Sequence, residues 1–260
     1  MAQFSALRRG SLDFTLYPLA YAGSEVPEVN IGLMPCLVSS YQQGLAWKTA
    51  PIGQQLTESL EQRGVKIITW IWQSGSVAAR GCAVMHPDDV KGLKIRGGSR
   101  EMDLMLKAAG GTISSVPSNE SLAAMQAGLL DATVTSSTSL ISFRMETISR
   151  AVTSGINRSF WFMFEPLLMS KSLYDGLPAD QQKAITEVGT SLEPFALEQA
   201  KADDAELENV FSRVGAKVVR FDAAALAQWR EIARNTAWTD FAARSPACAA
   251  LLKLAETVPA

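Results

Sequence analysis

Arg96 is the residue of this chain that offers the clearest binding chemistry. It ends a short predicted strand, Gly92–Arg96, and the pair Gly97–Gly98 follows it. The glycines let the backbone turn closely around whatever the guanidinium binds, and ligands of open α/β sheets lie beyond the carboxyl ends of the strands. A guanidinium presents a planar pair of N–H donors that matches a carboxylate. The pattern alone leaves two interpretations open, a carboxylate-binding arginine and a surface arginine paired with Asp88 or Asp89.

The histidine and cysteine content restricts catalytic and metal chemistry. His86 is the one histidine, and it precedes Pro87 in a polar turn, so we interpret it as a solvated loop residue. A lone histidine cannot build a histidine-rich metal site, and a Ser-His-Asp triad would have to use this residue. The three cysteines, Cys36, Cys82 and Cys248, are isolated and include no C-x-x-C pair. This predicts small buried side chains rather than a disulfide framework.

Carboxylates remain as the residues with which an enzyme could work. In that alternative function, Arg96 would orient a substrate carboxylate, and Glu165 or Asp131 would act as the base. The chain lacks a paired nucleophile, which weighs against this alternative. A ligand-sensing domain of a regulatory assembly is a third option, but the sequence contains no DNA-reading or signalling module. A binding protein without catalysis is therefore our first hypothesis.

Aromatic side chains gather in two segments that could form a pocket wall. Trp70 and Trp72 alternate along the predicted strand Val65–Trp72 and so face the same side. Trp161 lies in the segment 160–166 (FWFMFEP), among the most aromatic of the chain. We predict that Trp72 and Trp161 contact the ligand, with packing in the core as the alternative for each.

Three polar side chains extend the predicted pocket. Glu165 stands among apolar neighbours, and a carboxylate there needs a partner if it is buried. Tyr17 and Tyr21 follow the first predicted strand and could form hydrogen bonds with a ligand from the other half of the molecule.

The composition sets the class of protein. The chain has 260 residues, of which 47% are hydrophobic and 19% charged, with a net charge of -2. These values are typical of a globular chain that forms one large domain or two small lobes. A nucleic-acid binder would carry a strongly basic surface, so we exclude nucleic acid as a partner. No apolar run reaches the ~20 residues that a membrane span needs, so we expect no direct membrane insertion.

The elements that position the candidate residues read as an alternation of helices and strands. This alternation predicts an α/β architecture with mostly parallel strand pairing. The predicted elements are a helix around Phe4 and Leu7, a strand over Asp13–Tyr17, a helix over Gly53–Arg63, strands over Val65–Trp72, Gly92–Arg96 and Leu130–Thr135, and helices capped by Ser99 and by Ser118, the latter with Leu129 facing inward.

The last third of the chain is predicted to be mainly helical. The pattern stays helical from Pro178 to Val214, and Pro194 should bend this stretch because its ring removes a backbone hydrogen bond. A bent helix of this length would suit a spine that bridges two lobes, with a ligand cleft between them. A strand over Lys217–Phe221 follows, and two final helices are predicted after the caps Asp222 and Ser245.

Four segments resemble the solute receptors of tripartite ATP-independent periplasmic (TRAP) transporters, the DctP-type family. Any one of these motifs would be weak, but together they keep the family's order and spacing over essentially the whole chain. They are Leu7–Asp13 (LRRGSLD), Pro87–Arg96 (PDDVKGLKIR), Met125–Asp131 (MQAGLLD), and Leu168–Lys171 (LMSK) with Leu177–Gln182 (LPADQQ).

The resemblance implies a two-lobed periplasmic binding protein fold of the α/β class, with a long bent spine helix. We expect residues 1–73 and 162–200 to form the N-terminal lobe and the spine, and residues 74–161 and 201–260 to form the C-terminal lobe. The resemblance also implies a non-enzymatic receptor in the periplasm that closes over a small organic acid. Such receptors pass the acid to a membrane permease without ATP, and the arginine at the position of Arg96 holds the ligand carboxylate.

Departures from the family pattern change the expected pocket. Thr135 stands near the position of a usual asparagine, and Ser118 replaces a frequent aromatic residue. We predict Thr135 as a ligand contact, but the identity of the acid does not transfer. Receptors for 2-oxo acids carry Trp-Glu-Pro where this chain has Phe-Glu-Pro at Glu165. The resemblance thus allows a cation beside the ligand at Glu165, while we predict no cofactor and no other metal ligand.

The front of the chain also departs from the family. Family members begin with a signal peptide and then a first strand and helix, and this chain resembles them from the following helix onward. Arg8-Arg9 and the apolar residues after them superficially copy a secretory signal, but Asp13 and Pro18 interrupt it. The periplasmic location therefore rests on the resemblance. A sheet that lacks a strand has an unpaired edge, so we expect this chain alone to bind weakly or to be unstable.

Overall fold

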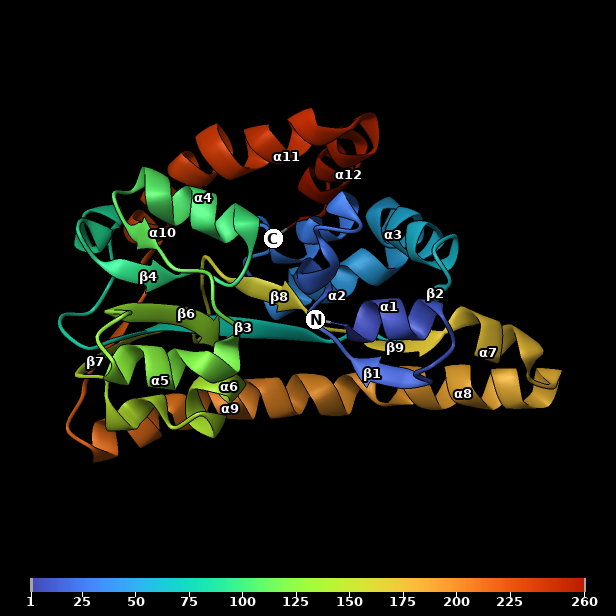
Figure 1. The fold of residues 1–260 in the computed structure, drawn as a ribbon, viewed down its shortest axis with the longest axis horizontal. Helices are drawn as coiled ribbons and strands as arrows, with labels where there is room; N and C mark the ends of the chain where they lie inside the picture. The colour runs from blue at the N-terminus through green and yellow to red at the C-terminus, as the bar shows by residue number, and fades with distance from the viewer. Residues whose placement is uncertain (1, 260) are drawn as a thin grey trace.

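The computed structural model, which describes residues 2–259, contains two β-sheets and a cover of helices (Figure 1). The small sheet has the strand order β1–β9–β2, formed by Phe14–Leu16, Leu167–Ser170 and Val65–Thr69, and all its pairs are antiparallel. The predicted first helix and first strand are confirmed as α1 (Gln3–Arg8) and β1. Among the described residues β1 pairs only with β9, and its Phe14 and Leu16 are exposed.

The large sheet has the strand order β10–β7–β3–β6–β4–β5, and β8 pairs with the start of β3. The pairs β10·β7, β4·β5 and β4·β6 are parallel, whereas β3 is antiparallel to β6, β7 and β8. The prediction of mostly parallel pairing is therefore wrong, and the sheet is mixed. The strands are β3 (Trp72–Ala79), β4 (Lys94–Arg96), β5 (Thr112–Ile113), β6 (Ala132–Ser136), β7 (Ala151–Ser154), β8 (Phe162–Phe164) and β10 (Lys217–Arg220).

The predicted strand Val65–Trp72 is two strands in different sheets. β2 ends at Thr69 in the small sheet, and β3 begins at Trp72 and continues to Ala79 in the large one. The chain crosses between the sheets here without a helix. The extension of β3 escaped prediction because its residues 74–76 (SGS) are small and polar, although they are buried.

Capping residues begin several helices as predicted. The Ser99 hydroxyl accepts from the backbone of Met102, and Asp222 and Ser245 cap their helices in the same way. The prediction for Ser118 is wrong, because it begins a short 3₁₀ turn without a side-chain cap, and Leu129 is exposed rather than inward. The α-helices not yet given are α2 (Tyr41–Ala46), α3 (Pro51–Glu61), α4 (Arg100–Ala108), α5 (Ser121–Gln126), α6 (Ser137–Ser142), α7 (Lys171–Gly176), α10 (Ala223–Ala233), α11 (Thr239–Arg244) and α12 (Pro246–Glu256). Short 3₁₀ turns are η1 (Leu19–Ala22), η2 (Pro27–Leu33), η3 (Trp47–Thr49), η4 (Pro87–Val90), η5 (Ser118–Glu120) and η6 (Met145–Thr147), and a π-helical turn, η7, spans Arg234–Trp238.

The predicted bent spine is present as α8 (Ala179–Ser191) and α9 (Glu193–Arg213). The two helices meet at Leu192, just before Pro194, which occupies the first turn of α9. α8 packs on β2 of the small sheet. α9 packs on β7 of the large sheet and on the helix α6 (Figure 1). The spine therefore runs beneath both sheets. Every helix among the described residues is too short or too polar to span a bilayer.

The close contact between α8 and β2 yields a stability prediction. A Cβ at Gly189 would lie 2.4 Å from the backbone oxygen of Ile68, so Gly189→Ala must push the spine from the small sheet. We expect the free energy of unfolding to fall by about 1 to 2 kcal/mol, as overpacking usually does. Gly176→Ala is the matched control, because nothing lies within 4 Å of its added Cβ. Urea titrations of both variants would measure the difference, and equal stabilities would contradict this packing.

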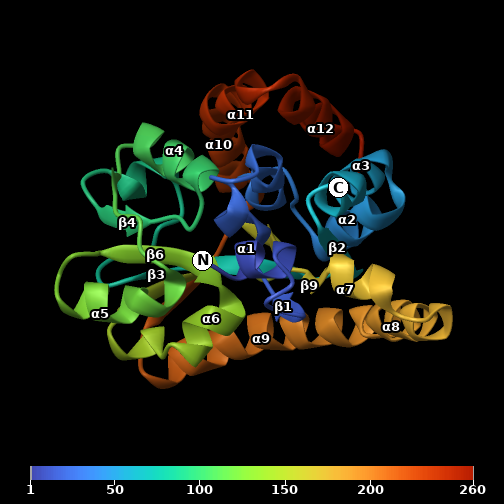
Figure 2. The same ribbon diagram turned by 45° about the vertical axis from the view of Figure 1, so that its right-hand side comes forward.

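The C-terminal helices connect the two parts of the molecule. Figure 2 shows them arching from α10, beside α4, to α12, beside α3. The sequence predicts residues 201–260 in the C-terminal lobe with residues 74–161, and α10 does contact α4 of that range. α12 instead packs on α3 and η2, both before residue 73 in the chain. The exact lobe boundaries stay a prediction.

Candidate ligand-binding pocket

A small enclosed pocket lies at the carboxyl ends of β4 and β6. Its volume is about 60 Å³. A buried water molecule needs roughly 10–15 Å³ on this measure, so the pocket has room for about four to six water molecules. Five of the seven residues predicted as ligand contacts line it together, and the structure brings them from separate parts of the chain: Tyr21, Arg96, Thr135, Trp161 and Glu165.

Arg96 lies in this pocket with 2% of its surface exposed. Its Nε donates to the carbonyl of Val116 at 3.0 Å and Nη1 donates to that of Val134 at 2.8 Å. Nη2 donates to the hydroxyl of Tyr21 at 3.1 Å. The alternative of a surface arginine paired with an aspartate is wrong, because Asp88 pairs with Lys91 and Asp89 accepts from backbone N–H groups of Met85 and His86.

The Arg96 guanidinium is a buried positive charge that makes no hydrogen bond or ion pair with a carboxylate among residues 2–259, and the Asp103 carboxylate acts on it only through its charge. Burial lowers its pKa, but an arginine stays protonated in proteins. Of its five N–H groups, three have the partners given above, which leaves one on each terminal nitrogen. A buried charge is costly unless it is paired. The geometry therefore suits a ligand carboxylate.

The backbone next to Arg96 must be glycine for the pocket to form. Gly98 has a φ of +93°, and a Cβ there would lie 2.9 Å from Nη1 of Arg96. A side chain at this position would both strain the backbone and press on the guanidinium. This is the physical reason for the glycine pair that follows the strand.

Tyr21 lines the pocket from η1, and Arg96 lines it from the end of β4. We expect Tyr21→Phe to weaken ligand binding about tenfold, because it removes the hydroxyl that accepts from the guanidinium, and hydrogen bonds to charged groups contribute about 1.5–3 kcal/mol. Isothermal titration with a small organic acid would measure the change. Tyr174→Phe is a control outside the pocket, and an equal loss in both variants would contradict a specific role for Tyr21.

Trp161, Met163 and Glu165 alternate along the β8 segment and line the pocket together. The indole Nε1 of Trp161 donates to the carbonyl of Gly97 at 3.1 Å, which fixes the ring beside the turn after Arg96. Met163 escaped sequence reasoning, although the period of two that joins Trp161 to Glu165 would have found it.

Hydroxyl groups form a further wall. Thr135 lies on β6, Ser139 follows on α6, and Ser118 begins η5. Thr135 and Ser118 are the two positions that depart from the family pattern. Ser139 and Ser118 were not predicted as site residues, because small polar residues near the start of a helix are typical of helix caps.

Glu165 is the acid of the pocket. The amide of Gln73 donates to its Oε2 at 2.7 Å. Burial raises the pKa of Glu165 to about 7, although the Gln73 hydrogen bond acts in the opposite direction. With this pKa, Glu165 can change between a neutral donor and a charged acceptor near neutral pH.

Among residues 2–259, no group of three or more His, Cys, Asp or Glu side chains could hold a metal ion.

Two predicted contacts do not line the pocket. Trp72 packs in the core, with ring centroids 5.1 Å from both Trp47 and Phe164. Trp70 contacts the same Phe164 ring, so the two tryptophans share a side, as alternation predicts, but this side faces the core. Tyr17 is buried and packs edge-on against Tyr21, so it supports a pocket residue instead of lining the pocket.

Of the residues proposed for catalysis, Arg96 and Glu165 line the pocket together. Asp131 accepts from the backbone N–H of Lys94 and does not line the pocket with Glu165. His86 lies at η4, with Nδ1 3.2 Å from the amide oxygen of Gln228. The three cysteines are free, and Cys36 and Cys248 are buried as predicted. The prediction is wrong for Cys82, which is exposed.

Comparisons with known proteins agree with this fold and site. Residues 1–244 match the family model DctP, described as bacterial extracellular solute-binding protein, family 7. A solute-binding protein of Albidiferax ferrireducens is 54% identical over 255 residues, which are 98% of this chain and 75% of that protein. The C4-dicarboxylate-binding periplasmic protein DctP of Rhodobacter capsulatus is 22% identical over 205 residues, which are 78% of this chain and 60% of that protein.

Solved structures give the same result. A TRAP periplasmic solute-binding protein from Rhodoferax ferrireducens with bound malonate has a TM-score of 0.97 and 54% identity, over 99% of this chain and 81% of that one. A TRAP periplasmic solute-binding protein from Sulfitobacter has a TM-score of 0.88 at 21% identity, over 98% and 83%, which shows the shared fold. These proteins are receptors and not enzymes. The two lobes, the bent spine and the match over nearly the whole chain mean that this protein belongs to family 7 of the bacterial extracellular solute-binding proteins.

Proposed function

We propose that this protein is the periplasmic receptor of a TRAP transporter and that it binds a small dicarboxylate at Arg96. The buried, unpaired guanidinium is the observation that carries the proposal, because it needs an anion when the pocket is closed. The malonate in the structure of the 54% identical Rhodoferax protein supports a small dicarboxylate. Membrane permease subunits would be the partners that receive the ligand.

Ligand binding would act through closure of the pocket. A ligand shifts an equilibrium between open and closed forms only through contacts that are better in one of them. Tyr21 of η1 and Arg96 of β4 meet at 3.1 Å, and we infer that this contact belongs to the closed arrangement. A carboxylate on the free N–H groups of Arg96 would neutralise the charge that closure buries.

The size of the pocket supports a short ligand. The volume is small, about 60 Å³, which favours a short acid over a larger one such as a hexuronate. The hydroxyls near Arg96 would bind the first carboxylate, and Glu165 would face the far end of the ligand.

A thermal-shift and calorimetric titration tests this function. We expect malonate and succinate to raise the melting temperature, with galacturonate and uncharged propanediol as the large and neutral controls. The titration is run on this chain and on a chain to which the residues that the longer Rhodoferax relative adds have been joined. Recovery of the unchanged acid afterwards separates a receptor from an enzyme. Equal shifts with the acid and the neutral compound in both chains would contradict the proposal.

A further inference from the structure

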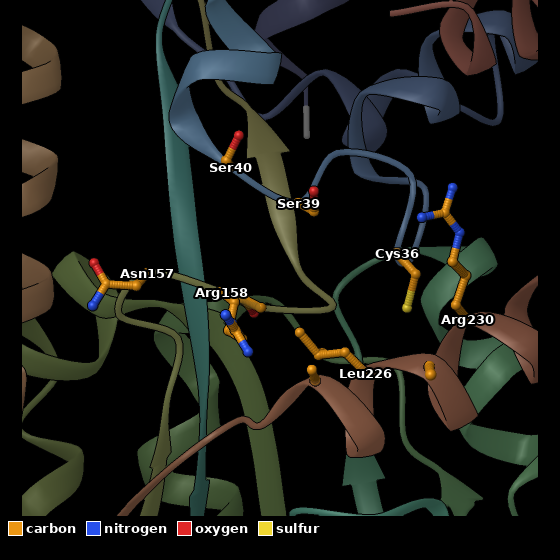
Figure 3. Close-up of a pocket in the computed structure, with 10 residues that line it drawn as sticks. Cys36, Ser39, Ser40, Asn157, Arg158, Leu226 and Arg230 are labelled. Atoms are coloured by element: carbon orange, nitrogen blue, oxygen red, sulfur yellow. The ribbon is translucent and has the colours of Figure 1, made fainter. Parts of the chain in front are cut away.

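A second cavity lies outside the ligand pocket, between three separate segments. Its volume is about 440 Å³, within the usual range for small-molecule sites. Residues 36–40 form one side, residues 157–159 a second, and the first turns of α10 a third. Figure 3 shows Arg158 on the residue 157–159 segment and Arg230 on α10, with Leu226 between them in this view. We call this cavity the arginine groove.

The arginine groove carries two positive charges that form no ion pair with an acid among residues 2–259. Its lining includes Arg158 and Arg230 and no acidic residue. Both side chains are exposed, and neither forms an ion pair among the described residues, whereas arginines such as Arg63, Arg220 and Arg244 do. Arg230 is held in place by the ring of Trp238, whose centroid is 5.6 Å away. Both guanidinium groups are therefore available to an anion.

The backbone of the arginine groove is unusual on two of its sides. Cys36 has a φ of 58° and Asn157 a φ of 66°, and both lie in the left-handed region that residues with a side chain rarely adopt. These are two of the three non-glycine residues with positive φ in the described chain. Such conformations cluster at binding sites and switch regions, so the backbone is a second, independent indication of a binding site here.

One segment connects the arginine groove to the ligand pocket. Ser159 lines the groove, and Trp161, two residues later, lines the pocket. The Ser159 hydroxyl accepts from the backbone of Trp161 at 3.0 Å and donates to the carbonyl of Gly75 at 2.7 Å. The backbone N–H of Cys36 donates to the carbonyl of Phe160 at 2.9 Å. A change in the groove therefore has a short, hydrogen-bonded route to the pocket wall.

We propose that the arginine groove is a second binding site, for a small dianion whose two acid groups are separated by an apolar middle. The two guanidinium groups would bind the acid groups, and Leu226, Ala227 and Cys36 would contact the apolar part. The groove described here belongs to the closed arrangement, in which Tyr21 meets Arg96. An occupant that fits it stabilises that arrangement and so tightens binding of the acid at Arg96. This coupling rests on the proposed function, whereas the second site does not.

Terephthalate is a suitable probe, with benzoate as the single-acid control. Amide chemical shifts from nuclear magnetic resonance are followed during titration of the full chain. We expect terephthalate to shift the amides of residues 39–40, 157–159 and 223–227, and Arg158→Gln with Arg230→Gln to weaken this binding at least about tenfold. The control double variant, Arg80→Gln with Arg150→Gln, removes the same charge outside the groove and should leave the affinity for terephthalate unchanged.

Either of two results would overturn the second site: the groove amides do not shift, or both double variants bind terephthalate with the same affinity. Shifts confined to the residues around Arg96 also overturn it, because the probe then occupies only the ligand pocket. For the coupling, we expect saturating terephthalate to tighten malonate binding about fivefold, and an unchanged malonate affinity overturns it.

Discussion

Replacing Arg96 by alanine is expected to weaken binding of malonate at least about a hundredfold. The bound carboxylate would then be buried without its positive partner, and breaking a buried ion pair costs about 3–5 kcal/mol. Arg96→Lys should recover part of the affinity, because an ammonium keeps the charge but lacks the planar pair of donors. Isothermal titration calorimetry measures both variants.

Folding of the Arg96 variants has to be measured beside their affinity. The guanidinium also donates to the carbonyls of Val116 and Val134, so alanine leaves two buried acceptors without a donor. Arg150→Ala is the control, because Arg150 does not line the pocket. Malonate affinity that survives in a folded Arg96→Ala protein would remove Arg96 from the site.

Replacing Glu165 by glutamine is expected to change how stability depends on pH. Burial raises the pKa of Glu165 from 4.5 to about 7. Between these values the native protein keeps a proton that the unfolded chain has lost, so the free energy of unfolding falls as pH rises. The contribution of this one group reaches about 3 kcal/mol. Between pH 4.5 and pH 7, the free energy of unfolding of Glu165→Gln should therefore rise by about 3 kcal/mol relative to that of the wild type.

Urea titrations between pH 4 and pH 8 measure this effect, with Glu198→Gln as the control at an exposed acid on α9. Burial also raises the pKa values of Glu101 and Asp204, but these groups are the same in both variants and cancel in the comparison. Parallel stability curves for the wild type and Glu165→Gln would contradict a buried, neutral Glu165.

Short-range sequence patterns correctly predicted the helix starts and the helix bend that depend on a single residue. Ser99, Asp222 and Ser245 begin helices because each side chain accepts a nearby backbone N–H, and this needs no tertiary information. Arg96 needed more than a strand end followed by glycines, because only the resemblance of Pro87–Arg96 to the family motif favoured binding over a surface position. The bend near Pro194 likewise follows from the missing N–H of proline.

Features that depend on the path of the chain between the sheets escaped prediction. The break between Thr69 and Trp72 has no turn residues, because the chain passes directly from one sheet into the other. Alternation placed Trp70 and Trp72 on one side correctly, but it could not tell a core side from a pocket side. Ser118 has the residue type of a helix cap, and only the positions of β4 and β6 make it part of the pocket.

A crystal structure of the protein soaked with malonate would test the pocket directly. The two oxygens of one ligand carboxylate should lie within hydrogen-bond distance of Nη1 and Nη2 of Arg96, with Tyr21 closed over them and Glu165 near the other end. Malonate bound elsewhere at full occupancy, with the guanidinium free of any acid, would mean that this buried cation serves the fold and not the ligand.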